Sequence, residues 1–278
     1  MCASALVLDA VPSRASSCRV LDRGTGRRRF TLVLPPDTRP DRPLGLLVAL
    51  HGRGEAYDPA LGARAWVDRY GLVSALDRVL APPIAPTARR PDWTPERLAE
   101  VNTSLAASPF RGLAVACPYT PDVARAANPR AALDELGRFV LDEVVPAARA
   151  LAPIASGPSA VRIDGCSMGG PLALELFLAR PDAFGGVGVV QPAMGPHRAK
   201  GFADRLRAAR ATHHRGPVHV LTSRGDPFRD GAMALAKAVG EAGVPVALRD
   251  SPGPHDQPWL RETGSIEMLL AHERGVSP

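Results

Sequence analysis

Short apolar runs recur along the chain and are separated by stretches with the spacing of amphipathic helices. Residues 28–34 alternate between apolar and polar side chains and stop at Pro35, whereas residues 44–50 are almost continuously apolar. A continuous run of this length is typical of a β-strand that is covered on both faces. Further runs of this second kind occupy residues 112–117, 160–164, 186–190, 218–222 and 244–248.

The segments between these runs predict helices. Residues 128–150 begin with Asn128 as a cap and a proline at the first helical position, and they place Leu136 and Val140 on one apolar face. Pro146 is expected to bend or end this helix. Further helices are predicted at residues 171–180, 203–211, 231–241 and 258–272. Strands that alternate with helices predict an α/β fold with a mostly parallel, doubly wound sheet.

A chain of 278 residues with 45% hydrophobic content can bury a full core, and we expect one domain over residues 1–278. Residues 55–111 break the alternation, because they contain no clear strand but many prolines and the aromatic side chains of Trp66 and Trp93. We interpret this stretch as an inserted helical cap. It forms either a small satellite that covers an open sheet edge or a lid over the substrate pocket. The aromatic side chains favour the lid, with Trp66 and Trp93 lining the pocket.

Charge and composition exclude several classes of function. The net charge of +6 comes from 34 basic and 28 acidic residues, and the basic residues are scattered, with a single run at 27–29. This pattern does not predict a nucleic-acid groove. No apolar run approaches the length of a membrane span, and residues 1–11 lack the basic start of a signal peptide. We therefore expect a cytoplasmic protein without a nucleic-acid or membrane partner, and the composition leaves its oligomeric state open.

The four cysteines carry no metal or disulfide signature. Cys2, Cys18, Cys117 and Cys166 show neither a CxxC motif nor a ligand-like spacing. We expect no metal site and no disulfide framework.

The hexapeptide Gly165-Cys166-Ser167-Met168-Gly169-Gly170 lies where the predicted strand at 160–164 meets the predicted helix at 171–180. This context predicts a nucleophile elbow, a sharp turn that exposes its central serine. Such a turn needs small neighbours because the backbone is strained and the next helix passes close by, and Gly165 and Gly169 meet that need. Cys166 precedes the apex of the turn, so we expect it to be a small buried side chain rather than the nucleophile.

A serine nucleophile needs a base and a group that orients the base. In hydrolases with a nucleophile elbow, the acid and then the histidine follow the serine, each after a later strand. Asp226 follows the predicted strand at 218–222, and His255 lies in a glycine- and proline-rich loop after the last predicted strand. We assign Ser167, Asp226 and His255 as nucleophile, acid and base. The weaker alternatives are Asp230, Asp250 and Asp256 for the acid, and His197, His213, His214 and His219 for the base.

An acyl-transfer site also needs donors for the oxyanion, and backbone N–H groups supply them without reorganisation. The N–H of Met168 begins the helix after the elbow. The N–H of Arg53 follows His51-Gly52 at the end of the strand at 44–50. We expect these two amides to form the oxyanion hole.

Together these motifs resemble the esterase D branch of the α/β hydrolases, which includes feruloyl esterases and polyester depolymerases. The likeness spans about residues 28–272 and rests on His51 to Gly54, the elbow, Gly225-Asp226-Pro227 and the segment from Gly253 to Trp259. It implies an α/β-hydrolase fold with a helical insertion after the third strand, and ester hydrolysis by a serine triad without a cofactor. The long insertion and the missing signal peptide depart from the branch, and they favour a small or medium-sized ester over an extracellular polymer.

The leading hypothesis is a carboxylesterase-like serine hydrolase that acts on a small-molecule ester. Two alternatives stay open: an acyltransferase or a peptide- or thioester-processing enzyme that uses the same triad, and a non-catalytic binding protein with a hydrolase fold. Gln191 and Met194, which follow the predicted strand at 186–190, are further candidates for the pocket.

Overall fold

The computed structural model describes residues 18–213 and 216–274, and within them the strands form one sheet of eight in the order β1-β2-β4-β3-β5-β6-β7-β8. In chain order the strands are β1 (Arg19–Thr25), β2 (Arg28–Leu34), β3 (Gly45–Leu50), β4 (Leu113–Pro118), β5 (Val161–Gly165), β6 (Gly186–Val190), β7 (Val218–Gly225) and β8 (Val246–Pro254). β2 pairs antiparallel with β1 and β4, and all other neighbours are parallel. The predicted α/β class with a mostly parallel sheet is confirmed.

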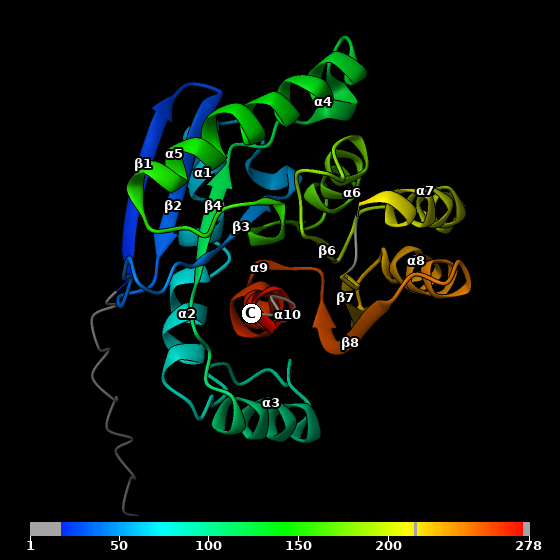
Figure 1. Ribbon diagram of the computed structural model, residues 1–278. Coiled ribbons are helices and arrows are strands. Elements are labelled where there is room, and N and C mark those ends of the chain that lie inside the picture. Colours follow the sequence, from blue (N-terminus) through cyan, green and yellow to red (C-terminus); the bar gives the residue numbers. More distant parts are fainter. Residues whose placement is uncertain (1–17, 214–215, 275–278) are drawn as a thin grey trace, which may run out of the picture.

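Helices cover both faces of this sheet (Figure 1). One face carries α4 (Pro129–Arg138), α5 (Val145–Leu151), α6 (Gly169–Ala179), α7 (Ala199–Thr212) and α8 (Arg229–Glu241). The other face carries α1 (Pro59–Asp68), α2 (Leu72–Leu80), α3 (Pro95–Ala107) and α10 (Ser265–Arg274). A short helix, α9 (Gln257–Trp259), leads into α10. Each face has its own apolar cluster, because the central strands are buried on both sides.

The 55–111 stretch contributes to this second layer and is not a satellite at the sheet edge. The helix α2 directs Leu72, Leu76 and Val79 into the same cluster as Ile266 and Met268 of α10. α3 is tied to α10 by an ion pair of 2.6 Å between Arg97 Nη2 and Glu267 Oε2. The apolar stripes of these helices therefore cover one face of the sheet.

One strand was not predicted from the sequence. The edge strand β1 is largely exposed, so its sequence lacks the apolar signature of a strand, and it pairs with β2 through a tight turn with positive φ at Gly24 and Gly26. Pro146, which was expected to bend or end its helix, does not end it. A π-helical stretch at Phe139–Val144 precedes α5 and widens the turn before the proline ring, so the helix continues to Leu151.

No helix in the described part of the chain is long and apolar enough to cross a membrane.

Candidate active site

Ser167 occupies a strained turn between β5 and α6, as the sequence predicts. Its φ of 53° lies in the left-handed region, which is costly for a residue with a side chain. The turn is held by hydrogen bonds from the Ser167 N–H to the Val190 carbonyl and from the Ala193 N–H to the Ser167 carbonyl, both 2.9 Å long. A Cβ at Gly165 would lie 2.2 Å from the Gly169 carbonyl oxygen, so the expected need for small neighbours is confirmed.

The side chains of Ser167, His255 and Asp226 lie in a continuous hydrogen-bonded row. His255 Nε2 lies 3.0 Å from Ser167 Oγ, and His255 Nδ1 lies 2.9 Å from Asp226 Oδ1. Because a carboxylate only accepts, Nδ1 carries the proton of the neutral imidazole and Nε2 is left to accept the serine hydroxyl. The three residues come from the ends of β5, β7 and β8, which meet at one edge of the sheet.

The carboxylate of Asp226 is fixed by groups that the sequence analysis did not identify. Thr222 Oγ1 donates to Asp226 Oδ2 at 2.9 Å, and the Phe228 N–H donates to Oδ1 at 2.9 Å. The Asp226 side chain is fully buried, so these donors compensate for lost hydration. The position of Thr222 within β7, four residues before Asp226, is the signal that identifies it.

The alternative acids and bases suggested by the sequence form other contacts or lie away from Ser167. Asp250 pairs with Arg229 at 2.7 Å, and Asp230 lies in the first turn of α8. Among the histidines, His219 is buried against His272, with ring centroids 5.3 Å apart. His197 and His213 are exposed, and His214 lies outside the described residues.

The two expected oxyanion amides lie on segments that meet at Ser167. The Cβ of Ser167 lies 3.4 Å from where a Cβ at Gly52 would be, which places the turn before Arg53 directly beside the serine. Within the described residues, neither the Arg53 N–H nor the Met168 N–H has a hydrogen-bond acceptor. Both amides are therefore free to receive a ligand oxygen.

His51 anchors the same turn. Its Nδ1 lies 2.7 Å from the Gly52 carbonyl oxygen, and its Nε2 accepts the Thr120 N–H at 2.9 Å. Burial lowers the pKa of His51 to about 4, which keeps the ring neutral and able to accept at Nε2.

A cavity of about 640 Å³ opens beside Ser167. Its apolar lining includes Leu133 of α4, Pro171 and Leu172 of α6, and Phe228. Charged lining residues are Arg53, Asp122, Arg130, Glu175 and Arg198. A concave site with apolar walls and a few charged groups is suited to a small organic ligand.

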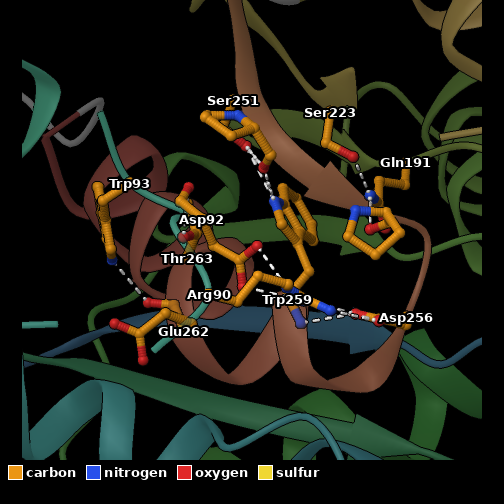
Figure 2. Close-up of polar contacts among 12 residues, drawn as sticks. Arg90, Asp92, Trp93, Gln191, Ser223, Ser251, Asp256, Trp259, Glu262 and Thr263 are labelled. Atoms are coloured by element: carbon orange, nitrogen blue, oxygen red, sulfur yellow. Dashed lines mark hydrogen bonds and ion pairs between the residues drawn. The ribbon is translucent and has the colours of Figure 1, made fainter. Parts of the chain in front are cut away.

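The expectation that Trp66 and Trp93 line this pocket is wrong, as is the placement of a lid there by residues 55–111. No residue of 55–111 lines the cavity beside Ser167. Trp66 is 0% exposed and packs in the core with Tyr70, because the apolar stripe of α1 faces the sheet. Trp93 donates from Nε1 to the Glu262 carbonyl (Figure 2) and borders a separate cavity of about 220 Å³.

Gln191 and Met194 do not line the cavity either. Met194 is buried in the apolar cluster that also contains residues of α7 and α8. Gln191 has a positive φ of 44°, and its side-chain amide donates to Ser223 Oγ at 2.7 Å and to the Pro254 carbonyl at 3.0 Å. Since Pro254 directly precedes His255, Gln191 fixes the start of the histidine loop.

Arg90 holds the other end of that loop (Figure 2). Its guanidinium donates two hydrogen bonds to Asp92, of 2.8 and 2.9 Å, and two to Asp256, of 2.8 and 3.0 Å. Asp256 Oδ1 also accepts the Trp259 N–H at 2.8 Å and so caps α9. Burial acts to raise the pKa of Asp256, but the bonds from Arg90 and the Trp259 N–H outweigh it and hold the pKa below its usual value.

A second buried network connects the turn at Arg53 to the histidine loop. Glu55 accepts hydrogen bonds from the Tyr70 hydroxyl and from Gln257 Nε2, the latter at 3.0 Å. The Tyr70 oxygen in turn accepts the Gly52 N–H at 3.3 Å. Cys166 lies buried beside this network, where burial raises its thiol pKa, so it stays protonated and inert.

Comparisons with known proteins show the fold. No protein-family model matches the chain, and no curated protein sequence matches it. Solved structures do match: a ferulic acid esterase has a TM-score of 0.63 and 16% identity over 92% of this chain and 97% of its own. An S-formylglutathione hydrolase from Staphylococcus aureus has a TM-score of 0.60 and 16% identity, with 95% and 100% covered.

A second S-formylglutathione hydrolase, from Agrobacterium tumefaciens, has a TM-score of 0.61 and 14% identity over 95% of this chain and 98% of its own. At such low identity these likenesses establish a shared α/β-hydrolase fold.

Proposed function

We propose that this α/β-hydrolase-fold protein is a serine hydrolase that cleaves a carboxylic ester through an acyl-enzyme on Ser167. The observation that carries the proposal is the hydrogen-bonded row from Ser167 through His255 to Asp226. A binding protein with this fold has no need of a base within reach of a strained serine. That the solved neighbours include esterases and thioester hydrolases supports the same reaction class.

The reaction has two halves, acylation of Ser167 and hydrolysis of the acyl-enzyme. In the first, Ser167 Oγ attacks the ester carbonyl while His255 Nε2 takes the hydroxyl proton, and Asp226 stabilises the imidazolium that forms. The Arg53 and Met168 amides stabilise the negative charge on the carbonyl oxygen. The tetrahedral intermediate then expels the alcohol, which receives the proton from His255.

In the second half, a water molecule replaces the alcohol. His255 removes its proton, the hydroxyl adds to the acyl carbonyl, and the Ser167 oxygen leaves with the proton returned by His255. The products are the carboxylic acid and the free enzyme.

The test uses 4-nitrophenyl butyrate and a fluorophosphonate probe. The wild-type protein should release 4-nitrophenol, and mass spectrometry should find the probe on Ser167. A Ser167→Ala variant should lose both reactions, whereas Ser74→Ala, which removes an exposed serine of α2, should keep both. Full activity in Ser167→Ala would refute the proposal.

A further inference from the structure

The cavity beside Ser167 has more positive than negative charge on its walls. It is lined by the guanidinium groups of Arg53, Arg130 and Arg198 but by the carboxylates of Asp122 and Glu175 only. An ester substrate that enters it therefore meets an electropositive surface.

Each of the two carboxylates is already shared by two arginines. Asp122 Oδ2 lies 3.2 Å from Arg53 Nε and 3.6 Å from Arg125 Nε. Glu175 lies 2.8 Å from Arg205 Nη2 and 3.6 Å from Arg198 Nη2. The distance to Arg198 is too long for a hydrogen bond, so this guanidinium keeps its donors for a ligand.

Arg130 adds a further cation on α4. Its Nε lies 3.2 Å from Asp134, which leaves the two terminal nitrogens at the exposed end of the side chain. With Arg125 and Arg205 included, five guanidinium groups thus face three carboxylates, an excess of two positive charges.

Two of these arginines also occupy unfavourable positions. Arg130 lies in the first turn of α4 and Arg198 directly precedes α7, and neither helix has an acidic residue in its first turn. A cation near the positive end of a helix dipole is destabilising, and an anion beside it relieves that repulsion.

The first part of the wall between Ser167 and Arg198 is apolar. Pro171 and Leu172 lie in the first turn of α6, and Glu175 lies six residues beyond Gly169, about 9 Å along the helix axis at 1.5 Å per residue. A ligand that extends from Ser167 along this wall contacts Pro171 and Leu172 before it reaches Glu175, whose carboxylate lies 3.6 Å from Arg198 Nη2.

We propose that the cavity selects esters that carry an anionic group at the end of an apolar arm, with Arg198 and Arg130 as the residues that recognise the anion. The proposal rests on the proposed function, because it takes Ser167 as the nucleophile. The planar guanidinium suits a carboxylate, since it donates two parallel hydrogen bonds.

The experiment compares pairs of esters in which one member carries a free carboxylate and the other its methyl ester. In the first pair the charge is on the acyl group: mono-4-nitrophenyl suberate against 4-nitrophenyl methyl suberate. In the second pair it is on the leaving group: 4-acetoxybenzoate against methyl 4-acetoxybenzoate. In at least one pair, kcat/KM should be about 10-fold higher for the anionic ester, and the preference should shrink as salt screens the charges.

Variants assign the preference to the two arginines. Arg198→Gln and Arg130→Gln should each reduce the ratio of kcat/KM between the anionic and the neutral ester about threefold or more. Arg207→Gln removes an exposed arginine of α7 that does not line the cavity, and as a matched control it should leave the preference intact. Equal kcat/KM values within both pairs would overturn the proposal, and turnover of the neutral esters would show that the proposed function still stands.

If no ester is cleaved, binding measurements still test whether the cavity selects anions. Calorimetric titration of Ser167→Ala with suberic acid mono-4-nitroanilide and with its methyl ester measures recognition without turnover. Tighter binding of the anionic amide, lost in the Arg198→Gln background, supports anion selection even if no ester is cleaved. Equal affinity for the two amides counts against it.

Discussion

Arg90 donates two hydrogen bonds, of 2.8 and 3.0 Å, to Asp256, the residue that directly follows His255. The other side of its guanidinium binds Asp92, whose side chain is 0% exposed. A bidentate, charge-assisted pair fixes orientation as well as distance. The 55–111 stretch therefore reaches the active site through the backbone of the histidine loop, even though it does not line the cavity.

Replacing Arg90 with alanine should lower kcat on 4-nitrophenyl butyrate about 10-fold and leave KM unchanged. His255 loses its fixed position relative to Ser167, while the cavity walls stay in place. Steady-state kinetics and the rate of fluorophosphonate labelling measure the effect. Arg89→Ala, which removes the exposed neighbouring arginine, is the control. A lower melting temperature with an unchanged kcat would assign Arg90 to stability alone.

Replacing Thr222 with valine should reduce kcat about 10-fold. The change keeps the shape of the side chain but removes the hydroxyl that donates to Asp226 Oδ2, so the carboxylate holds His255 less firmly. Thr222→Ser restores the donor and should recover most of the activity. The idea fails if kinetics show that the valine variant is as active as the serine variant.

The free energy of unfolding should fall as the pH drops from 6.5 towards 4, in part because of His51. Its folded pKa of about 4 lies below the usual 6.5, so the unfolded state binds a proton that the folded state excludes. The full contribution is present above pH 6.5 and amounts to about 3 kcal/mol, all of which is lost by about pH 4.

Urea unfolding of the wild type and of His51→Gln at pH 7 and pH 5 measures this loss. Glutamine does not titrate, so the variant should lose less stability between the two pH values, even though its absolute stability is lower. His272, whose burial lowers its pKa to about 3, adds a similar loss in both proteins and cancels in the comparison. Equal losses in the two proteins would show that His51 does not titrate in this range.

Replacing Trp66 with alanine should cost about 3–5 kcal/mol of stability, because a fully buried aromatic side chain is lost. Trp66→Phe should cost far less, since the indole Nε1 has no hydrogen-bond partner in the described structure. Chemical denaturation measures both. The kcat/KM of the phenylalanine variant should equal that of the wild type. A changed ester preference would instead show that Trp66 contacts the substrate.

The sequence predicted the central sheet because each buried strand is an uninterrupted apolar run between polar loops. It did not predict β1, whose exposed side chains carry no such signal. Nor did it place the 55–111 helices correctly. Amphipathic spacing shows that α2 has a buried face, but the surface on which that face packs depends on α10, nearly two hundred residues away.

The candidate site also contains some residues that the sequence predicted and others that it did not. Chain order predicted that Ser167, Asp226 and His255 lie together, and the structure brings their side chains into contact. Arg90 and Asp256 are 166 residues apart in sequence, and no local sequence pattern predicts their contact. The pocket residues were mispredicted for a related reason, because aromatic content does not distinguish a buried core from a cavity wall.

Part of the cavity wall comes from a segment that carries no reactive side chain. Leu133 and Arg130 belong to α4, whereas Ser167, Asp226 and His255 follow β5, β7 and β8. Since α4 and the loop before it carry none of the three reactive side chains, exchange of residues 122–133 offers a route to engineered variants with new ester preferences and an unaltered reaction chemistry.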